Sequence, residues 1–371
     1  MQDINHYTGF IAAAALFVFV PVLTTSGQVP DVAFEPYGYV AQRPSDSLEI
    51  DGRLDEESWQ EAAWSENFMD IRGGDYPDPD YDTRVKMLWD EEYLYIGARL
   101  EEPHIWATLT QRDTVIFYDN DFEVFIDPDG DTHHYYELEI NALGTVWDLM
   151  LTMPYRDGGR AIDAWDISGL RKGIQIEGTL NSPSDKDTAW TVELALPWNV
   201  LEEAASHGGP PDEGEQWRIN FSRVQWHTEI REGRYRKKED PETGEPLPEE
   251  NWVWSPQGLI NMHYPEMWGF LQFSTLPVDR DPPVFKIGKE EQIKWNLRKL
   301  YYQQREYREM HGQYAAEVEN LDLSELPDHI RKQMKFARGF NSYEIMLPSL
   351  SGDGYWGINE TGKIFFKETG N

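Results

Sequence analysis

The chain has 371 residues, of which 33 are basic and 67 acidic, so its formal net charge is −34. A field of this sign repels DNA, RNA and anionic membranes and attracts divalent cations, which argues against nucleic-acid binding. The 15 tryptophans, 19 tyrosines and 16 phenylalanines supply enough apolar surface for a large folded core. The absence of cysteine excludes disulfides, thiolate catalysis and cysteine-ligated zinc.

The N-terminus has the pattern of an export signal. Residues 10–23 are apolar, and this stretch is too short for a comfortable transmembrane helix. Small polar residues follow at 24–27, which indicates a cleavage site near Gln28. No lysine or arginine precedes the apolar stretch, so a buried helix in the mature protein is the alternative. We expect a signal peptide at 1–27 and a secreted or periplasmic protein without a stable membrane anchor.

From the leader to about residue 276, the sequence predicts strands. Clusters of glycine and proline separate segments in which apolar and polar residues alternate, at 85–89, 94–100, 190–196, 217–224 and 268–273. Strands do not alternate with helices here, so a parallel sheet is not expected. The pattern predicts a mainly β protein, an antiparallel β-sandwich of the immunoglobulin or jelly-roll kind. A short helix is expected at 56–63, with Asp55 as its N-cap.

The composition changes after Pro277. Residues 286–319 are rich in Lys, Arg, Glu and Gln, with apolar residues at helical spacing, and the pattern extends to 328–340. Residues 354–357 are typical of a turn, and 363–367 of a short strand. We therefore expect three parts, which are a signal peptide at 1–27, a sandwich at 28–276 and a partly helical extension at 277–371.

Residues 121–150 contain two alternating strands around an acidic loop. One face of this hairpin is apolar, with Phe122, Val124, Ile126, Leu138 and Ile140. The opposite face carries Glu123, Glu137, Glu139 and Asn141, and Trp147 follows. Carboxylates and an amide beside an indole ring suit a sugar, which offers hydroxyl donors and ring C–H faces. An ordinary solvated sheet face is the alternative.

Other candidate ligand-binding residues lie in or beside loops. Tryptophans at such positions are Trp165, Trp226 and Trp254. Each can equally be a core residue, but we expect at least one of them to stack on a ligand. Arg223 lies where one face of its strand changes from apolar to polar, which is typical of a strand that runs from the core to a rim. A structural ion pair is the alternative for Arg223.

The loop of the hairpin is a candidate metal site. Asp127, Asp129 and Asp131 alternate around Gly130, and hard oxygen ligands of this kind suit structural calcium. The spacing differs from that of an EF-hand, so a plain acidic loop is the alternative.

A series of motifs between about residues 39 and 274 resembles the family 9 carbohydrate-binding modules. The motifs, in chain order, are those at 50–56 followed by Trp59, then 83–96, 121–127, 190–198, 217–221 and 268–271. The resemblance implies a β-sandwich that binds sugars, often attached to or encoded near polysaccharide-degrading enzymes. It also raises the expectation of structural calcium.

The resemblance implies ligand contact for Glu123 and Asn141. Characterised members clamp a terminal sugar between two tryptophans, but the corresponding positions here fall at Phe117 or Tyr118 and at 262–264. Glu139 stands where the family has a ligand-contacting arginine.

Three functions are consistent with these patterns. The first is carbohydrate binding by a secreted protein that acts in polysaccharide recognition and catabolism. The second is a glycoside hydrolase or another glycan-active enzyme on the same sandwich, with Glu123, Glu137 and Glu139 as candidate acid or base. The third is an interaction module whose C-terminal helical region contacts a partner.

Overall fold

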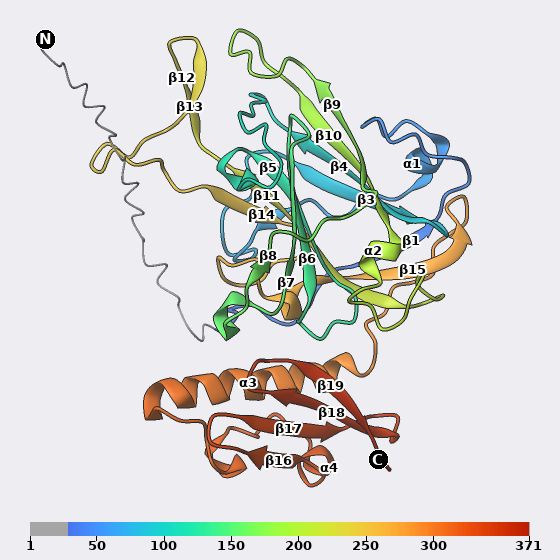
Figure 1. The fold of residues 1–371 in the computed structure, drawn as a ribbon, viewed down its shortest axis with the longest axis vertical. Coiled ribbons are helices and arrows are strands. Elements are labelled where there is room, and N and C mark those ends of the chain that lie inside the picture. The colour runs from blue at the N-terminus through green and yellow to red at the C-terminus, as the bar shows by residue number, and fades with distance from the viewer. Residues whose placement is uncertain (1–28, 371) are drawn as a thin grey trace, which may run out of the picture.

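The computed structural model describes residues 29–370 and has a β-sandwich above a smaller C-terminal part (Figure 1). The expected signal peptide at 1–27 lies outside the described residues. Within the described chain, we find no helix whose length and apolar character would suit a membrane span.

The sandwich consists of two sheets that share strand β1. One has the order β8-β7-β6-β5-β11-β15-β1, with β14 beside β11 and β2 beside β14, and the other has the order β1-β3-β4-β10-β9. The strands are β1 (Gly38–Arg43), β2 (Met69–Asp70), β3 (Thr83–Trp89), β4 (Tyr93–Glu101), β5 (Asp121–Asp127), β6 (Tyr135–Asn141), β7 (Val146–Leu151), β8 (Ala161–Ile162), β9 (Arg171–Glu177), β10 (Ala189–Pro197), β11 (Gln216–Gln225), β14 (Glu250–Val253) and β15 (Gly269–Pro277). A separate hairpin is formed by β12 (Thr228–Arg231) and β13 (Arg234–Lys237).

Strand β1 joins the two sheets because it changes partner along its length. Gly38–Ala41 pair in parallel with Phe270–Phe273 of β15, and Gln42 then pairs in parallel with Leu88 of β3. The other strand pairs that the structure describes are antiparallel. The predicted antiparallel β-sandwich is therefore confirmed, apart from this one parallel strand.

The main core lies between the two sheets. Its members from the hairpin are Phe122, Val124, Ile126, Leu138 and Ile140, the apolar face that the alternation predicts. They pack with residues of the second sheet such as Val192 and Leu194. Burial of each large apolar side chain contributes about 1.5–3 kcal/mol, so this layer supplies much of the stability of the sandwich.

The helices of the sandwich are short. They are α1 (Glu57–Glu61), α2 (Trp198–Leu201), η1 (Ile116–Tyr118), η2 (Tyr155–Asp157) and η3 (Pro265–Met267). The predicted helix at 56–63 exists in shortened form and buries Trp59, but its N-cap is Glu56, without a side-chain hydrogen bond. The prediction of Asp55 as N-cap is wrong.

The C-terminal part combines one long helix with a sheet. Its helices are α3 (Glu291–His311), η4 (Val318–Asn320) and α4 (Asp328–Arg331), and its strands are β16 (Lys335–Arg338), β17 (Tyr343–Pro348), β18 (Gly354–Asn359) and β19 (Ile364–Glu368). These strands form an antiparallel sheet in chain order, against which α3 packs. The predicted helical continuation at 328–340 is wrong beyond α4, and 354–357 belong to a strand, not to a turn. The boundary at residue 277 stays a prediction.

A buried ionic cluster joins the C-terminal part to the sandwich. Glu266, just before β15, accepts hydrogen bonds from Arg156 at 2.7 Å and from the hydroxyl of Tyr302 in α3 at 2.5 Å. Arg298 of α3 lies 4.0 Å from the same carboxylate. The two arginines hold the pKa of Glu266 at about 2 against the effect of burial, which alone would raise it. A neighbouring pair adds a second link, since Asp157 ion-pairs with Arg305 at 2.6 Å.

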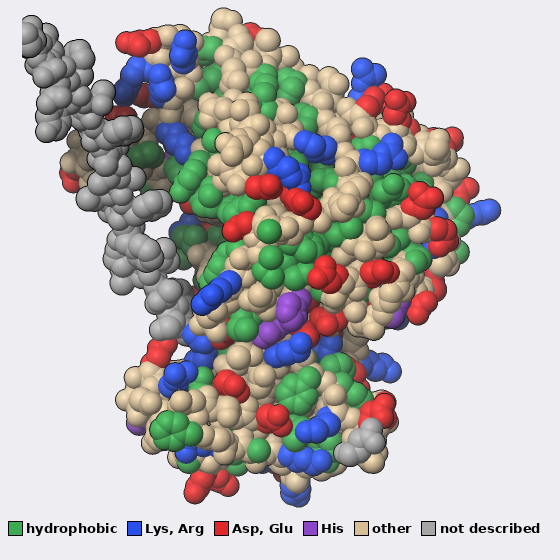
Figure 2. Space-filling view, viewed as in Figure 1, with side chains coloured by type: hydrophobic (Ala, Val, Ile, Leu, Met, Phe, Trp, Pro, Cys, Tyr) green, Lys and Arg blue, Asp and Glu red, His purple; other side chains and the backbone are tan. Residues whose placement is uncertain are grey.

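The surface narrows where these two parts meet, and charged side chains of both signs and a histidine lie there (Figure 2). Apolar packing crosses the same junction, because one hydrophobic cluster contains Tyr264 and Met267 together with Leu297 and Leu300 of α3. Ionic and apolar contacts together fix α3 against residues 259–267.

We predict that Glu266→Ala lowers the free energy of unfolding by about 3–5 kcal/mol, because it leaves Arg156 and Arg298 buried without their shared carboxylate. Urea unfolding followed by tryptophan fluorescence measures the change. The control is Glu325→Ala, which breaks the exposed Lys299–Glu325 pair and should cost at most about 1 kcal/mol. Equal effects of the two substitutions would contradict the assignment of the junction to Glu266.

Candidate functional site

The polar face of the β5–β6 hairpin forms a row across four strands. Ser222 of β11 lies opposite Glu123 of β5, which lies opposite Glu139 of β6, which in turn lies opposite Trp147 of β7. Directly opposite residues on adjacent strands share one face of a sheet. Glu123, Glu139 and Trp147 are therefore neighbours on one surface, and Asp121 joins them from the next row.

This face is covered, not presented to solvent. All seven residues of β5 and all seven of β6 are buried, and Glu123 and Glu139 are 5% and 1% exposed. A hydrophobic cluster with Phe125 and Trp268 lies at one end of the face, and a second cluster with Trp226 lies at the other. The expectation of an ordinary open sheet face is thus wrong, because loops and the segment before β15 pack over it.

Burial governs the electrostatics of the four carboxylates. It raises the pKa of Glu123 to about 7, and it raises the pKa values of Asp121, Glu137 and Glu139 well above their ordinary range. Nearby carboxylates act in the same direction, with Glu123 the largest charge on each of the other three. The site therefore favours protons or a cation.

Hydrogen bonds already occupy part of this face. One carboxylate oxygen of Glu139, Oε2, accepts the backbone N–H groups of Ile116 and Phe117 at 3.0 Å each and so anchors η1. The Asn141 amide donates to the carbonyl of Leu109 at 2.9 Å and to Asp119 at 3.0 Å. Asn141 has no exposed surface. In this structure its amide holds the loop before β5, and its role in ligand binding stays a prediction.

Of the predicted tryptophans, Trp147 lies on the polar face and is partly exposed, next to Glu139. Trp165 stacks on Tyr136 at 4.6 Å and packs against the inter-sheet core, so it lies on the opposite face. Trp254 is 0% exposed and donates its indole N–H to Glu66. Trp165 thus lies away from Glu123, and Trp254 offers no exposed ring, while stacking of a ligand on at least one of Trp165, Trp226 and Trp254 stays a prediction.

Trp226 lies at the edge of the polar face but offers little free ring surface. It is 9% exposed, and its indole N–H donates to the carbonyl of Phe117 at 2.8 Å. The ammonium of Lys237 lies 3.1 Å from the centre of its ring, a cation–π contact that occupies a ring face. Trp226 thus holds η1 and the β12–β13 hairpin together.

Arg223 belongs to the inter-sheet face. It lies opposite Phe122, a core residue, and its guanidinium ion-pairs with Glu102 at 3.1 Å. It also donates to Gln225 and to Thr83. The structure contains the alternative, a structural ion pair, and ligand binding by Arg223 stays a prediction.

Two exposed tyrosines stand beside the polar face: Tyr118, at the first clamp position that the resemblance indicates, and Tyr155, which the sequence analysis missed. Tyr118 ends η1 and is 56% exposed, and Tyr155 begins η2 and is 43% exposed. Partial burial is the largest cause that raises the pKa of Tyr155, and the charges of Glu137 and Glu139 raise it further. The Tyr155 ring therefore lies near these two carboxylates. We call Tyr118, Trp147 and Tyr155 the aromatic rim. Asp121 was also missed, although it lies two residues before Glu123 and so shares its face.

The second clamp position of the family holds no free aromatic ring here. Met262 and Tyr264 are buried, and His263 lies between Tyr135 and Tyr155. The His263 Nδ1 is 3.0 Å from the hydroxyl of Tyr135. Burial, with the nearby charge of Arg156, lowers the pKa of His263 from 6.5 to about 3. These residues form a wall of the site, not a stacking surface.

We predict that His263→Gln flattens the fall in stability between pH 6.5 and 3. The folded protein keeps His263 neutral while the unfolded chain takes up a proton near pH 6.5, so stability is lost as the pH falls through this window. One such proton costs up to about 1.4 kcal/mol per pH unit. Urea unfolding of both proteins across this range measures the difference, and parallel curves would contradict a buried neutral histidine.

The acidic loop after β5 is largely satisfied by its own backbone. Asp127 accepts the N–H groups of Gly130 at 3.1 Å and Thr132 at 2.9 Å, and Asp131 accepts that of His133 at 2.7 Å. Asp131 also ion-pairs with Lys363 at 2.8 Å. Oxygen atoms of Asp127, Asp129 and Asp131 still lie within 4.8 Å of one another. The geometry thus accommodates the predicted calcium as well as a plain acidic loop.

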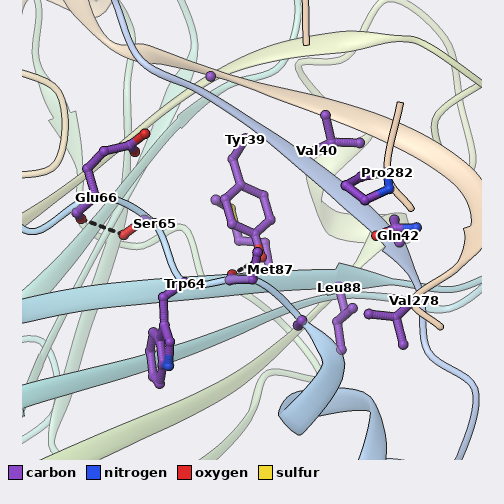
Figure 3. Close-up of a pocket in the computed structure, with 13 residues that line it drawn as sticks. Tyr39, Val40, Gln42, Trp64, Ser65, Glu66, Met87, Leu88, Val278 and Pro282 are labelled. Atoms are coloured by element: carbon purple, nitrogen blue, oxygen red, sulfur yellow. Dashed lines mark hydrogen bonds between the residues drawn. The ribbon is translucent and has the colours of Figure 1, made fainter. Parts of the chain in front are cut away.

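Two cavities differ in how close they lie to the polar face. One of about 190 Å³ lies between β1 and residues 62–66, with Tyr39, Trp64 and Met87 in its lining (Figure 3). The hydroxyl of Tyr39 there already donates to the carbonyl of Ala63 at 2.7 Å. Another, of about 360 Å³, is lined by residues 247–251 among others. It includes Glu249, whose charge raises the pKa of Glu123, so this second cavity adjoins the acidic face.

The fold defines the protein as an antiparallel β-sandwich protein with a buried acidic face. Residues 50–228 match the family described as "Carbohydrate family 9 binding domain-like". The family recognised from the sequence motifs is therefore confirmed over this segment, which includes Glu123, Glu139 and Trp147.

Solved structures with similar folds share little sequence with the chain. One is described as a putative carbohydrate-binding protein from Bacteroides uniformis, with 15% identity, a TM-score of 0.45, and coverage of 65% of this chain and 100% of that chain. Another is a family 9 module from Caldicellulosiruptor kristjanssonii in complex with cellotriose, with 15% identity, a TM-score of 0.39, and coverage of 67% and 100%. The same module in complex with glucose has 14% identity and a TM-score of 0.39, with coverage of 67% and 100%. No curated protein matches the chain.

Proposed function

We propose that the protein binds carbohydrate at the polar face of β5–β7, with the aromatic rim as its entrance. The observation that carries this proposal is the row Glu123–Glu139–Trp147, which places hydrogen-bond acceptors beside a partly exposed indole ring. The family match over residues 50–228 supports it. Sugars bind such surfaces by stacking a ring C–H face on an aromatic side chain while hydroxyl groups donate to acceptors.

The charge of the site selects the class of sugar. Asp121, Glu123, Glu137 and Glu139 are buried beneath the rim, where their carboxylates repel one another, and a sulfated or uronic polysaccharide would add to this repulsion. A neutral oligosaccharide is therefore the favoured ligand. Because the carboxylates lie below the surface, a sugar meets Trp147 and the tyrosines of the rim first.

The test compares two tryptophans on opposite faces of the same sheet. A glycan array of neutral oligosaccharides identifies a ligand, and calorimetry then measures its affinity for Trp147→Ala and Trp165→Ala. Loss of one stacking ring is worth about 1.4 kcal/mol or more, so Trp147→Ala should bind at least about tenfold more weakly. Trp165→Ala should keep wild-type affinity, since its ring packs on Tyr136 on the other face.

Equal affinities of both variants and the wild type would place the sugar site elsewhere. A loss with Trp165→Ala alone would do the same, since it would move the site to the opposite face. Circular dichroism of each variant establishes that the fold is intact.

Hydrolysis of the bound glycan is the second candidate function. Oxygen atoms of Glu123 and Glu139 lie within 4.8 Å of each other, and burial raises the pKa of Glu123 to about 7, which suits a proton donor near neutral pH. Release of new reducing ends from the array-identified glycan, abolished by Glu123→Gln, would support this function. Unchanged glycan after prolonged incubation would leave binding as the activity.

We also propose that the protein is exported and acts in polysaccharide catabolism outside the cytoplasm. The apolar stretch at 10–23 and the small residues that follow it support export. We predict that N-terminal sequencing of secreted or periplasmic material begins near Gln28. Recovery of an intact Met1 from that material would contradict cleavage.

A further inference from the structure

Three acidic side chains on the polar face form a compact group without a counter-charge. One carboxylate oxygen from each of Asp121, Glu123 and Glu139 lies within 4.8 Å of the other two, and all three side chains are at least nine-tenths buried. Among the described residues, none of the three takes part in a salt bridge, and the charges that raise their pKa values are other carboxylates.

The other clusters of acidic or histidine side chains in the described chain each have a basic partner. Asp148 ion-pairs with Arg112, Asp131 pairs with Lys363, and Glu215 pairs with His207. Only the group with Asp121 lacks a basic partner among the four clusters of acidic or histidine ligands in the part of the chain that the structure describes. A shortage of positive charge at the most buried cluster needs a compensating ligand or protons.

Asp121 adds an independent observation. It has no exposed surface, and neither of its carboxylate oxygens makes a hydrogen bond of good geometry within the described structure. The backbone N–H of Val224 on the neighbouring strand lowers the pKa of Asp121, but burial outweighs this effect. Buried polar atoms are nearly always satisfied, so two vacant acceptors on one side chain indicate a missing group at this point.

We propose that Asp121, Glu123 and Glu139 bind one divalent cation that prefers oxygen ligands, of which Ca²⁺ is the best suited. Both oxygens of Asp121 are available to it, and Glu139 can offer Oε1, since Oε2 already accepts two backbone N–H groups. A charge of +2 offsets most of the repulsion among three carboxylates. Calcium takes six to eight oxygen ligands, so water or hydroxyl groups complete its shell.

The cation site does not depend on the proposed carbohydrate function, because the three carboxylates and the unpartnered oxygens require compensation with or without a sugar.

The test uses the full chain, stripped of metal by a chelator and titrated with CaCl₂, MgCl₂ or MnCl₂ in a calorimeter without sugar. Two variants remove one charge each from the cluster, Asp121→Asn and Glu139→Gln. Each should weaken cation binding by at least about tenfold. The matched control is Asp129→Asn, which removes a charge from the acidic loop and should leave this binding event unchanged.

Thermal unfolding gives a second readout that does not require a resolved binding heat. Ca²⁺ should raise the melting temperature of the wild type through preferential binding to the native state. In EDTA, the melting temperature of Asp121→Asn should equal or exceed that of the wild type, because the substitution removes one repelling charge. When Ca²⁺ is added, this variant should lack the part of the rise in melting temperature that binding at this cluster causes. A variant that melts in this way is folded, so its loss of binding is not a loss of structure.

The cation site would be overturned if none of the three metals gave a binding heat or raised the melting temperature. Wild-type affinity for the cation in both cluster variants would overturn it as well. A response that Asp129→Asn alone abolishes would assign calcium to the acidic loop instead. Sugar calorimetry in EDTA and in Ca²⁺ separates this proposal from the carbohydrate function. Sugar binding that persists in EDTA and is weakened by Trp147→Ala supports the carbohydrate function, even if the metal titration shows no cation binding.

Discussion

The alternation of side chains along β5 and β6 is the constraint on which the rest of the molecule depends. Phe122, Val124 and Ile126 must face the second sheet to form the core, so Glu123 and its neighbours must face the other way. A shift of one residue would place carboxylates in the inter-sheet core. The fold therefore commits four acidic side chains to one surface and then covers that surface, which raises their pKa values and makes the site selective for protons, cations and hydroxyl donors.

The C-terminal part is linked to this cover through the segment before β15. Its helix α3 reaches Glu266 through Tyr302 and Arg298, and Glu266 belongs to the same short segment as His263 and Trp268. Trp268 packs with Phe125 at one end of the polar face, at a ring distance of 5.6 Å. The ionic cluster at the junction is thus coupled through a few residues to the wall of the site. Because a buried ion pair adds little net stability but penalises misplacement strongly, it is suited to fixing the position of this wall.

The sequence was sufficient to predict the sandwich and the grouping of Glu123 with Glu139, because both follow from a period of two within single strands. It could not predict that loops would cover them, since the groups that bind Glu139 and Asn141 come from residues 109–119. Arg223 shares a face with core residues, but its partner Glu102 is distant in sequence. Likewise, β18 gains its stability from pairing with β17, whereas the glycines at 354 and 357 make its local composition resemble a turn. Nonlocal contacts account for each of these differences.

Hydrogen–deuterium exchange with and without a saturating neutral oligosaccharide tests whether a sugar binds at the aromatic rim over the acidic face, because backbone protection reports the covered segments without any substitution. We expect slower exchange in peptides that span 114–123 and 144–157, with no change in peptides that span 335–368. Protection confined to 335–368, or to the outer strands of the second sheet at 171–177, would contradict binding at this rim.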